Sequence, residues 1–251
     1  MADAPSVAQA ASFEQALTAA RGADGWMTDE QARVLFERAR SLAAPATVVE
    51  IGSYRGRSAI VLASAAADGV EVVAIDPHAG NDRGPQQIEG TPGEGDADHA
   101  AFVSNLERAG VAARVTHLRL PSQDALGSLS GAVQLLYVDG AHRYAPARDD
   151  IARWGSRVAV GGTMLVHDSF SSVGVTLALV RLLALSGRWR YLGRTGSLAE
   201  YRRELGAARA QNLVRHLAEL PWFARNLAIK VLLLARLKPL ARALGSDHWP
   251  Y

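Results

Sequence analysis

The stretch Val48-Val49-Glu50-Ile51-Gly52-Ser53-Tyr54-Arg55-Gly56-Arg57-Ser58 runs from β-branched residues through a glycine turn into the start of a helix. The run at 47–51 predicts a buried strand, and 58–67 has the composition of a helix. A second apolar run, 70–75, follows and ends in Asp76. Strand, helix and strand in this order predict a β-α-β unit with parallel strands.

The same alternation continues along most of the chain. Ser12 and Thr28 are expected to cap two helices ahead of the unit. The further elements predicted are helices at 100–109, 146–156 and 173–185 and strands at 114–118, 133–138, 163–166, 189–192 and 198–202. The predicted fold is α/β, a Rossmann-like, seven-stranded, mostly parallel sheet with an antiparallel edge hairpin, extra N-terminal helices and a C-terminal helical tail.

Composition sets broad limits. The 251 residues are 49% hydrophobic and 21% charged, as expected of an ordinary globular chain. No apolar run reaches about 20 residues, and residues 1–11 lack a secretory signal, so a cytoplasmic location is expected. The absence of cysteine excludes thiolate chemistry. The predicted organisation is N-terminal helices at 1–44, a core at 45–205 with a lid at 78–99, and a basic helical extension at 206–251.

The glycines of the opening stretch suit a ligand site. Gly52 permits close approach of a ligand to the backbone, and Gly56 opens a helix whose free amides favour an electron-rich group. Asp76 can accept both hydroxyls of a ribose. A dinucleotide site would show G-x-G-x-x-G, whereas here Gly52-x-x-x-Gly56 follows Glu50 inside the strand.

This Glu-x-Gly-x-x-x-Gly pattern resembles the first motif of class I S-adenosylmethionine (SAM) dependent methyltransferases. An ordinary strand-to-helix glycine turn is the alternative. Pro121-Ser122-Gln123-Asp124 is similar to the Ser-Gln-Asp stretch of catechol-type O-methyltransferases, although alone it could be a helix cap. The resemblance implies SAM contacts from Glu50, Gly52, Ser53, Tyr54, Gly56, Ser58, Asp76, Ser122, Gln123 and Asp139.

Acidic residues also follow the fourth and fifth predicted strands, at Asp139 and at His167-Asp168. Two carboxylates at one sheet edge can hold a hard divalent cation such as Mg²⁺, which activates a hydroxyl. His142 lies three residues after Asp139 and is predicted to be the general base, with a loop histidine as the alternative.

The resemblance covers roughly 46–203 and is nearest to metal-dependent O-methyltransferases of sugar hydroxyls, including methylmannose polysaccharides. Related enzymes often present two acidic or amide ligands after the fifth strand, where this chain has His167-Asp168. Histidine is a poorer Mg²⁺ ligand, so His167 either orients Asp168 or favours Mn²⁺. Asp149 and Asp150 are expected to cap the next helix and face solvent, and Trp154 to lie in the core.

The acceptor and partners follow from the polar lid and the tail. Asn81, Asp82, Arg83, Gln86, Gln87, Glu89 and Asp96 suit a sugar or glycan acceptor. A phenolic O-methyltransferase and a non-catalytic SAM-fold module are the rival hypotheses. From Gly206 onward the chain has 7 basic and 2 acidic residues, so the residues before it carry a net charge of −3. This negative charge argues against a nucleic-acid partner. For the tail, packing on its own domain or in a homodimer, peripheral membrane contact and disorder stay open.

Overall fold

The computed structural model of the chain describes residues 11–81 and 89–245. Its strands are β1 (Ala46–Ile51), β2 (Val70–Ile75), β3 (Val115–Leu118), β4 (Val133–Val138), β5 (Val158–Val166), β6 (Trp189–Thr195) and β7 (Leu198–Arg203). Its helices are α1 (Phe13–Ala20), α2 (Asp29–Arg40), α3 (Arg57–Ala65), α4 (Pro92–Arg108), the short 3₁₀ helix η1 (Ala112–Arg114), α5 (Ser122–Ala125), α6 (Tyr144–Arg157), α7 (Val173–Leu183), α8 (Arg209–Ala218), α9 (Leu220–Leu234) and α10 (Lys238–Ala243).

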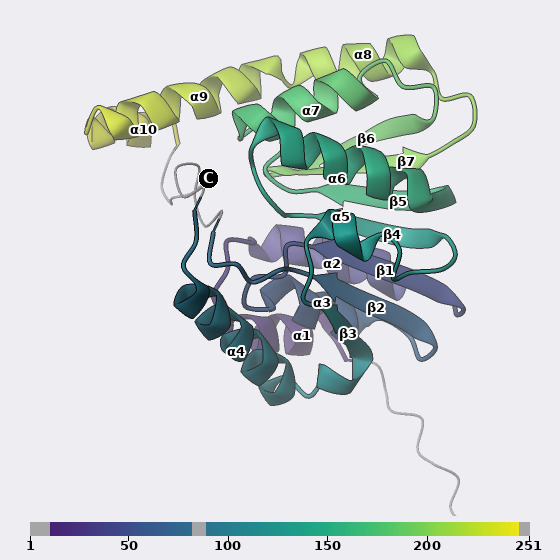
Figure 1. The fold of residues 1–251 in the computed structure, drawn as a ribbon. Helices are drawn as coiled ribbons and strands as arrows, with labels where there is room; N and C mark the ends of the chain where they lie inside the picture. Colours follow the sequence, from purple (N-terminus) through teal and green to yellow (C-terminus); the bar gives the residue numbers. More distant parts are fainter. Residues whose placement is uncertain (1–10, 82–88, 246–251) are drawn as a thin grey trace, which may run out of the picture.

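The strands form one sheet in the order β3-β2-β1-β4-β5-β7-β6 (Figure 1). The first five strands of this order pair in parallel, and β7 pairs antiparallel with both β5 and β6. The predicted fold is confirmed, including its antiparallel edge hairpin. Strand order reverses between β1 and β4, which is where open α/β sheets bind ligands.

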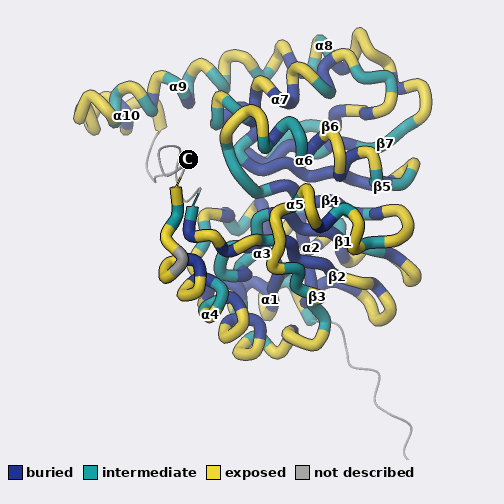
Figure 2. The backbone as a smooth tube through the Cα atoms, in the orientation of Figure 1, coloured by how far each residue is buried: buried dark blue, intermediate teal, exposed yellow. Residues whose placement is uncertain are grey.

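Helices cover both faces of the sheet and bury two apolar clusters (Figure 2). The first cluster joins α1, α2, α3 and α4 to the sheet, with Leu35, Ile60 and Phe102 almost fully buried. The second joins α6 and α7 to the other face, around Trp154 and Leu179. Trp154 lies in the core as expected. With both faces covered, the ends of the parallel strands provide the edge on which a site can form.

The predicted lid is shorter than expected, because α4 begins at Pro92 and takes up its last third. Proline suits the first turn of a helix, where its missing N–H costs nothing. Asp98, in the second turn of α4, lies 2.9 Å from Nε of Arg55 and so ties the helix to the glycine turn. The prediction of loop at 92–99 was therefore wrong. Lid residues 82–88, including Asp82, Arg83, Gln86 and Gln87, lie outside the described residues.

In its described part, 206–245, the predicted helical tail forms three helices. Pro221 and Pro239 each lie in the first turn of a helix, α9 and α10, where the missing N–H of proline is tolerated. The first part of the tail packs on its own domain. Asn212 of α8 accepts from the backbone N–H of Tyr191 at 3.0 Å, and Trp222 and Phe223 of α9 pack against the second apolar cluster.

Candidate active site

A cavity of about 280 Å³ opens at the ends of β1, β2 and β4. Its lining includes seven residues that the sequence predicted for cofactor binding or catalysis, namely Gly52, Tyr54, Asp76, Ser122, Gln123, Asp139 and His142. The strand ends bring them together because parallel strands present their carboxyl ends at one edge of the sheet.

Glycine is required at position 52 because the backbone after β1 passes very close to the backbone after β4. Its φ of +86° lies in the left-handed region, and a Cβ there would overlap the backbone carbonyl oxygen of Asp139. Gly56, with φ of +88°, precedes α3, and a Cβ on it would lie 3.1 Å from the ring of Phe102. Gly52 therefore keeps bare backbone beside the cavity, while Gly56 lets the turn pack against α4.

Asp76 is fixed by two backbone amides. Tyr54 N–H donates to Oδ2 at 2.8 Å and His78 N–H donates to Oδ1 at 2.7 Å. Each carboxylate oxygen has a second lone pair, so both can still accept hydrogen bonds from a ribose in the cavity.

Glu50, Ser53, Gly56 and Ser58 lie behind the cavity wall rather than on it. Glu50 is fully buried under the turn. Burial raises the pKa of its carboxyl to about 8, against the opposing effect of the Ser58 and Ser53 hydroxyls. These residues support the turn, and direct contact with a cofactor stays a prediction for them.

Asp150 was expected at the surface, and that prediction was wrong. It is 5% exposed, lines the cavity and accepts from the hydroxyl of Ser122, while Trp154 Nε1 donates to Ser122 O at 3.0 Å. Burial raises the pKa of Asp150 to about 6. Helical spacing could have predicted the burial of Asp150, because this residue shares a helix face with Ala147 and with the core residue Trp154.

Trp26 is a second lining residue that sequence reasoning missed. It lies in the loop between α1 and α2, and its indole stacks on the ring of Tyr54 with centroids 5.3 Å apart. Half of its surface is exposed. Together the two rings form an aromatic wall, and nothing local in the sequence places this loop at the cavity.

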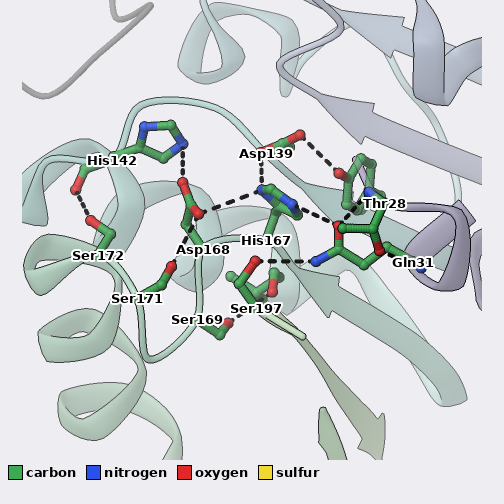
Figure 3. A network of polar contacts seen from close by, with 12 residues as sticks. Thr28, Gln31, Asp139, His142, His167, Asp168, Ser169, Ser171, Ser172 and Ser197 are labelled. Carbon is green, nitrogen blue, oxygen red and sulfur yellow. Dashed lines mark hydrogen bonds and ion pairs between the residues drawn. The ribbon is translucent and has the colours of Figure 1, made fainter. Parts of the chain in front are cut away.

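His142 and Asp168 form a close pair across the ends of β4 and β5 (Figure 3). Nε2 of His142 lies 2.8 Å from Oδ2 of Asp168, and the hydroxyl of Ser171 donates to Oδ1 at 3.1 Å. Asp168 adopts φ of +55°, an uncommon conformation for a residue other than glycine. Asp168 is not among the residues that line the cavity, and its contact with the cavity wall is through His142.

His167 lies between the two predicted metal ligands (Figure 3). Its Nδ1 is 3.0 Å from Oδ1 of Asp139 and 3.8 Å from Oδ1 of Asp168. On the other side of the ring, Nε2 is 3.3 Å from Oε1 of Gln31. Burial disfavours the charged ring, but Asp139 and then Asp168 outweigh it and raise the pKa of His167 to about 9.

The orientation of Gln31 supports a charged His167. Gln31 Oε1 also accepts from the backbone N–H of Thr28 at 2.9 Å, and Nε2 of Gln31 donates to the hydroxyl of Ser197 at 3.1 Å. The side-chain oxygen of Gln31 therefore faces His167. Both ring nitrogens of His167 then meet acceptors, as a doubly protonated imidazole requires.

These residues do not fit the predicted Mg²⁺ or Mn²⁺ site. A cation would need lone pairs of Asp139 and Asp168 in a shared space, and the His167 ring fills that space. A cation bound by His167 would also have to displace the proton that this ring holds towards Asp139. Within 11–81 and 89–245, no group of three histidine, aspartate or glutamate side chains has an arrangement that could hold a metal ion.

A comparison with protein families agrees with this geometry. Residues 49–169, from β1 to the loop after β5, match a family model described as a methyltransferase domain. This segment is therefore similar to methyltransferase domains. The predicted class of enzyme is thereby confirmed, and the match includes the glycine turn, Asp76, Ser122 and the His142–Asp168 pair.

Solved structures share the fold of most of this chain. The O-methyltransferase TomG from Streptomyces achromogenes, in complex with SAM, is 19% identical with a TM-score of 0.54, covering 76% of this chain and 89% of that chain. An O-methyltransferase from Bacillus cereus, in complex with SAH, is 18% identical with a TM-score of 0.54, covering 76% and 90%. An SAH-bound methyltransferase from Podospora anserina is 18% identical with a TM-score of 0.54, covering 76% and 87%.

Proposed function

We propose that the chain is a SAM-dependent O-methyltransferase that acts on a hydroxyl of a sugar, oligosaccharide or polysaccharide. One observation carries the proposal: a single cavity is lined by the Gly52 turn, Asp76 and Ser122 as well as by His142. The SAM and SAH in the three neighbouring structures support the choice of cofactor.

The cofactor would occupy the part of the cavity beside the glycine turn. Asp76 has the acceptors for its ribose, and Ser122 and Gln123 have polar groups for its adenine edge. SAM supplies a methyl group on a positively charged sulfur and leaves as SAH.

His142 is the proposed base for the acceptor hydroxyl. With Nε2 held by Asp168, the proton of the hydroxyl passes to Nδ1 as the oxygen bonds to the methyl carbon. The carboxylate of Asp168 then stabilises the imidazolium that forms. This step needs no metal ion, in keeping with the ion pair between His167 and Asp139.

Polar lining supports the sugar acceptor. Asn81, Asp98 and Arg143 lie on the cavity wall, and their side chains can hydrogen-bond a polyhydroxylated ligand. A phenolic acceptor is the second candidate, because the stacked rings of Trp26 and Tyr54 offer an aromatic wall for a flat ring.

A transfer assay separates these functions. Purified protein is incubated with methyl-labelled SAM and either a panel of sugars and glycans or a panel of catechols and phenols, with His142→Ala as control. Label in the sugar panel that is lost in the variant supports the proposal. Label in the phenol panel alone establishes the second candidate. If SAH binds with micromolar affinity and neither panel is labelled, the chain is a non-catalytic module.

A further inference from the structure

Helix α9 is fastened to the core near its middle. The side chain of Asn226 donates to the backbone oxygen of Phe170 at 3.0 Å, and Nζ of Lys230 donates to that of Ser171 at 2.7 Å. Asn226 and Ile229 are buried. Beyond these contacts the end of α9 extends past the sheet, and α10 then folds back on α9 (Figure 1), where Arg225 donates to the backbone oxygen of Gly245 at 3.0 Å.

This end of the chain, residues 231–245, is called the tip below. Most of it is exposed, as Figure 2 shows for α10. Leu234 is 76% exposed and Val231 is 61% exposed. The tip exposes five large aliphatic side chains, Val231, Leu234, Leu237, Leu240 and Leu244. So many aliphatic groups on one short segment indicate a surface that is covered by a partner.

The tip is also basic. Arg236, Lys238 and Arg242 are all exposed, and in the part of the chain that the structure covers no hydrogen bond or ion pair reaches their side chains. The sequence has no aspartate or glutamate from Leu220 to Gly245. The positive charge of the tip is therefore not balanced locally.

We propose that the tip docks on the surface of an anionic lipid bilayer. The aliphatic side chains would enter the boundary between headgroups and acyl chains, while Arg236, Lys238 and Arg242 stay at the level of the lipid phosphates. Contact with the bilayer is peripheral, since none of the helices in residues 11–81 and 89–245 is long and apolar enough to cross a membrane.

Charge favours this partner over a second copy of the chain. A two-fold contact through the tip would bring the same patch of each copy together, and with it two sets of the basic side chains Arg236, Lys238 and Arg242. An anionic surface instead attracts each of these groups. The proposed docking is thus the arrangement in which both the apolar and the charged groups of the tip gain a partner.

Vesicle flotation tests the proposal on the full chain. The protein is mixed with phosphatidylcholine vesicles with or without phosphatidylglycerol, at low and high salt. The wild type should float only with the anionic vesicles and less at high salt. The triple variant Arg236→Glu/Lys238→Glu/Arg242→Glu should bind at least about tenfold more weakly. Leu234→Ser/Leu240→Ser should also weaken binding.

The matched control reverses three exposed arginines elsewhere, Arg153→Glu/Arg181→Glu/Arg188→Glu, with the same change in net charge. It should float like the wild type. SAH affinity, measured in parallel, should be the same in all variants and shows that they are folded.

Three results overturn the proposal. In the first, the wild type stays unbound with anionic vesicles. In the second, the tip variant binds as well as the control. In the third, the wild type is a dimer in light scattering, the leucine variant is a monomer, and no vesicle is bound, so the tip joins two copies. Because the readout is flotation and not methyl transfer, failure here leaves the proposed enzymatic function standing, and the reverse holds as well.

Discussion

The imidazole of His142 and the carboxylate of Asp168 face each other at 2.8 Å, which joins the ends of two neighbouring parallel strands. Burial disfavours the charged ring, but the hydrogen bond and charge of Asp168 raise the pKa of His142 above its ordinary value of 6.5. Of these two residues, only His142 lines the cavity. This pairing assigns the proton transfer to His142 and a positioning role to Asp168.

Removal of the base should separate catalysis from binding. His142→Ala is expected to lower turnover by about a hundredfold or more, because the acceptor proton then has no nearby base. SAH affinity, measured by calorimetry, should change by less than about threefold, since Asp76 and the glycine turn are intact. Full activity in the variant would place the base elsewhere.

The pH dependence of turnover should report the same pair. His142 must be neutral to accept a proton, so the rate rises with pH through a midpoint above the ordinary histidine pKa of 6.5. Asp168→Asn removes the negative charge that raises this pKa and is expected to move the midpoint to lower pH, with a lower plateau. A midpoint that stays in place would show that another group titrates.

Glu50 should make the fold less stable as the pH rises. Its folded-state pKa of about 8 lies above the ordinary 4.5, so the folded state holds a proton that the unfolded state has lost. Stability from this group is therefore present below about pH 4.5 and lost towards pH 8. At about pH 9, Glu50→Gln should raise the free energy of unfolding by about 2 kcal/mol or more.

Denaturant titrations at several pH values measure this effect. Glu71→Gln, at an exposed position on β2, serves as the control and should change stability little at any pH. Equal behaviour of the two variants would mean that the Glu50 carboxyl is ionised in the folded protein.

A methyl group on the glycine turn should damage the cavity. Gly52→Ala places a Cβ on the Asp139 carbonyl at φ of +86° and is expected to cost about 1–3 kcal/mol of stability. SAH affinity should fall by more than about tenfold. Gly93→Ala is the matched control, because a Cβ there meets no atom within 4 Å. Unaltered SAH binding by Gly52→Ala would contradict the cavity as the cofactor site.

Chelation should leave the enzyme active. Because His167 fills the space between Asp139 and Asp168, treatment with EDTA is expected to change the rate of methyl transfer by less than about twofold. Direct titration with Mn²⁺, followed by its paramagnetic effect on water relaxation, should show no tight site. Loss of activity that Mg²⁺ or Mn²⁺ restores would show that His167 gives way to a cation.

The local sequence pattern predicted the helices, strands and main turn of the fold. The strand runs, the capping residues Ser12 and Thr28, and the turn at Gly52 follow from spacing and backbone preference, which act within a few residues. Seven of the predicted site residues also reached one cavity, because the carboxyl ends of parallel strands share an edge.

The tertiary structure alone decided which side chains meet. Gln31 and His167 are 136 positions apart, yet their contact, together with Asp139, turns an expected metal ligand into a charged partner of two carboxylates. The burial of Asp150 and the place of Trp26 likewise depend on elements that pack from other parts of the chain. Sequence spacing determines backbone and strand ends, whereas charge states follow from neighbours that only packing selects.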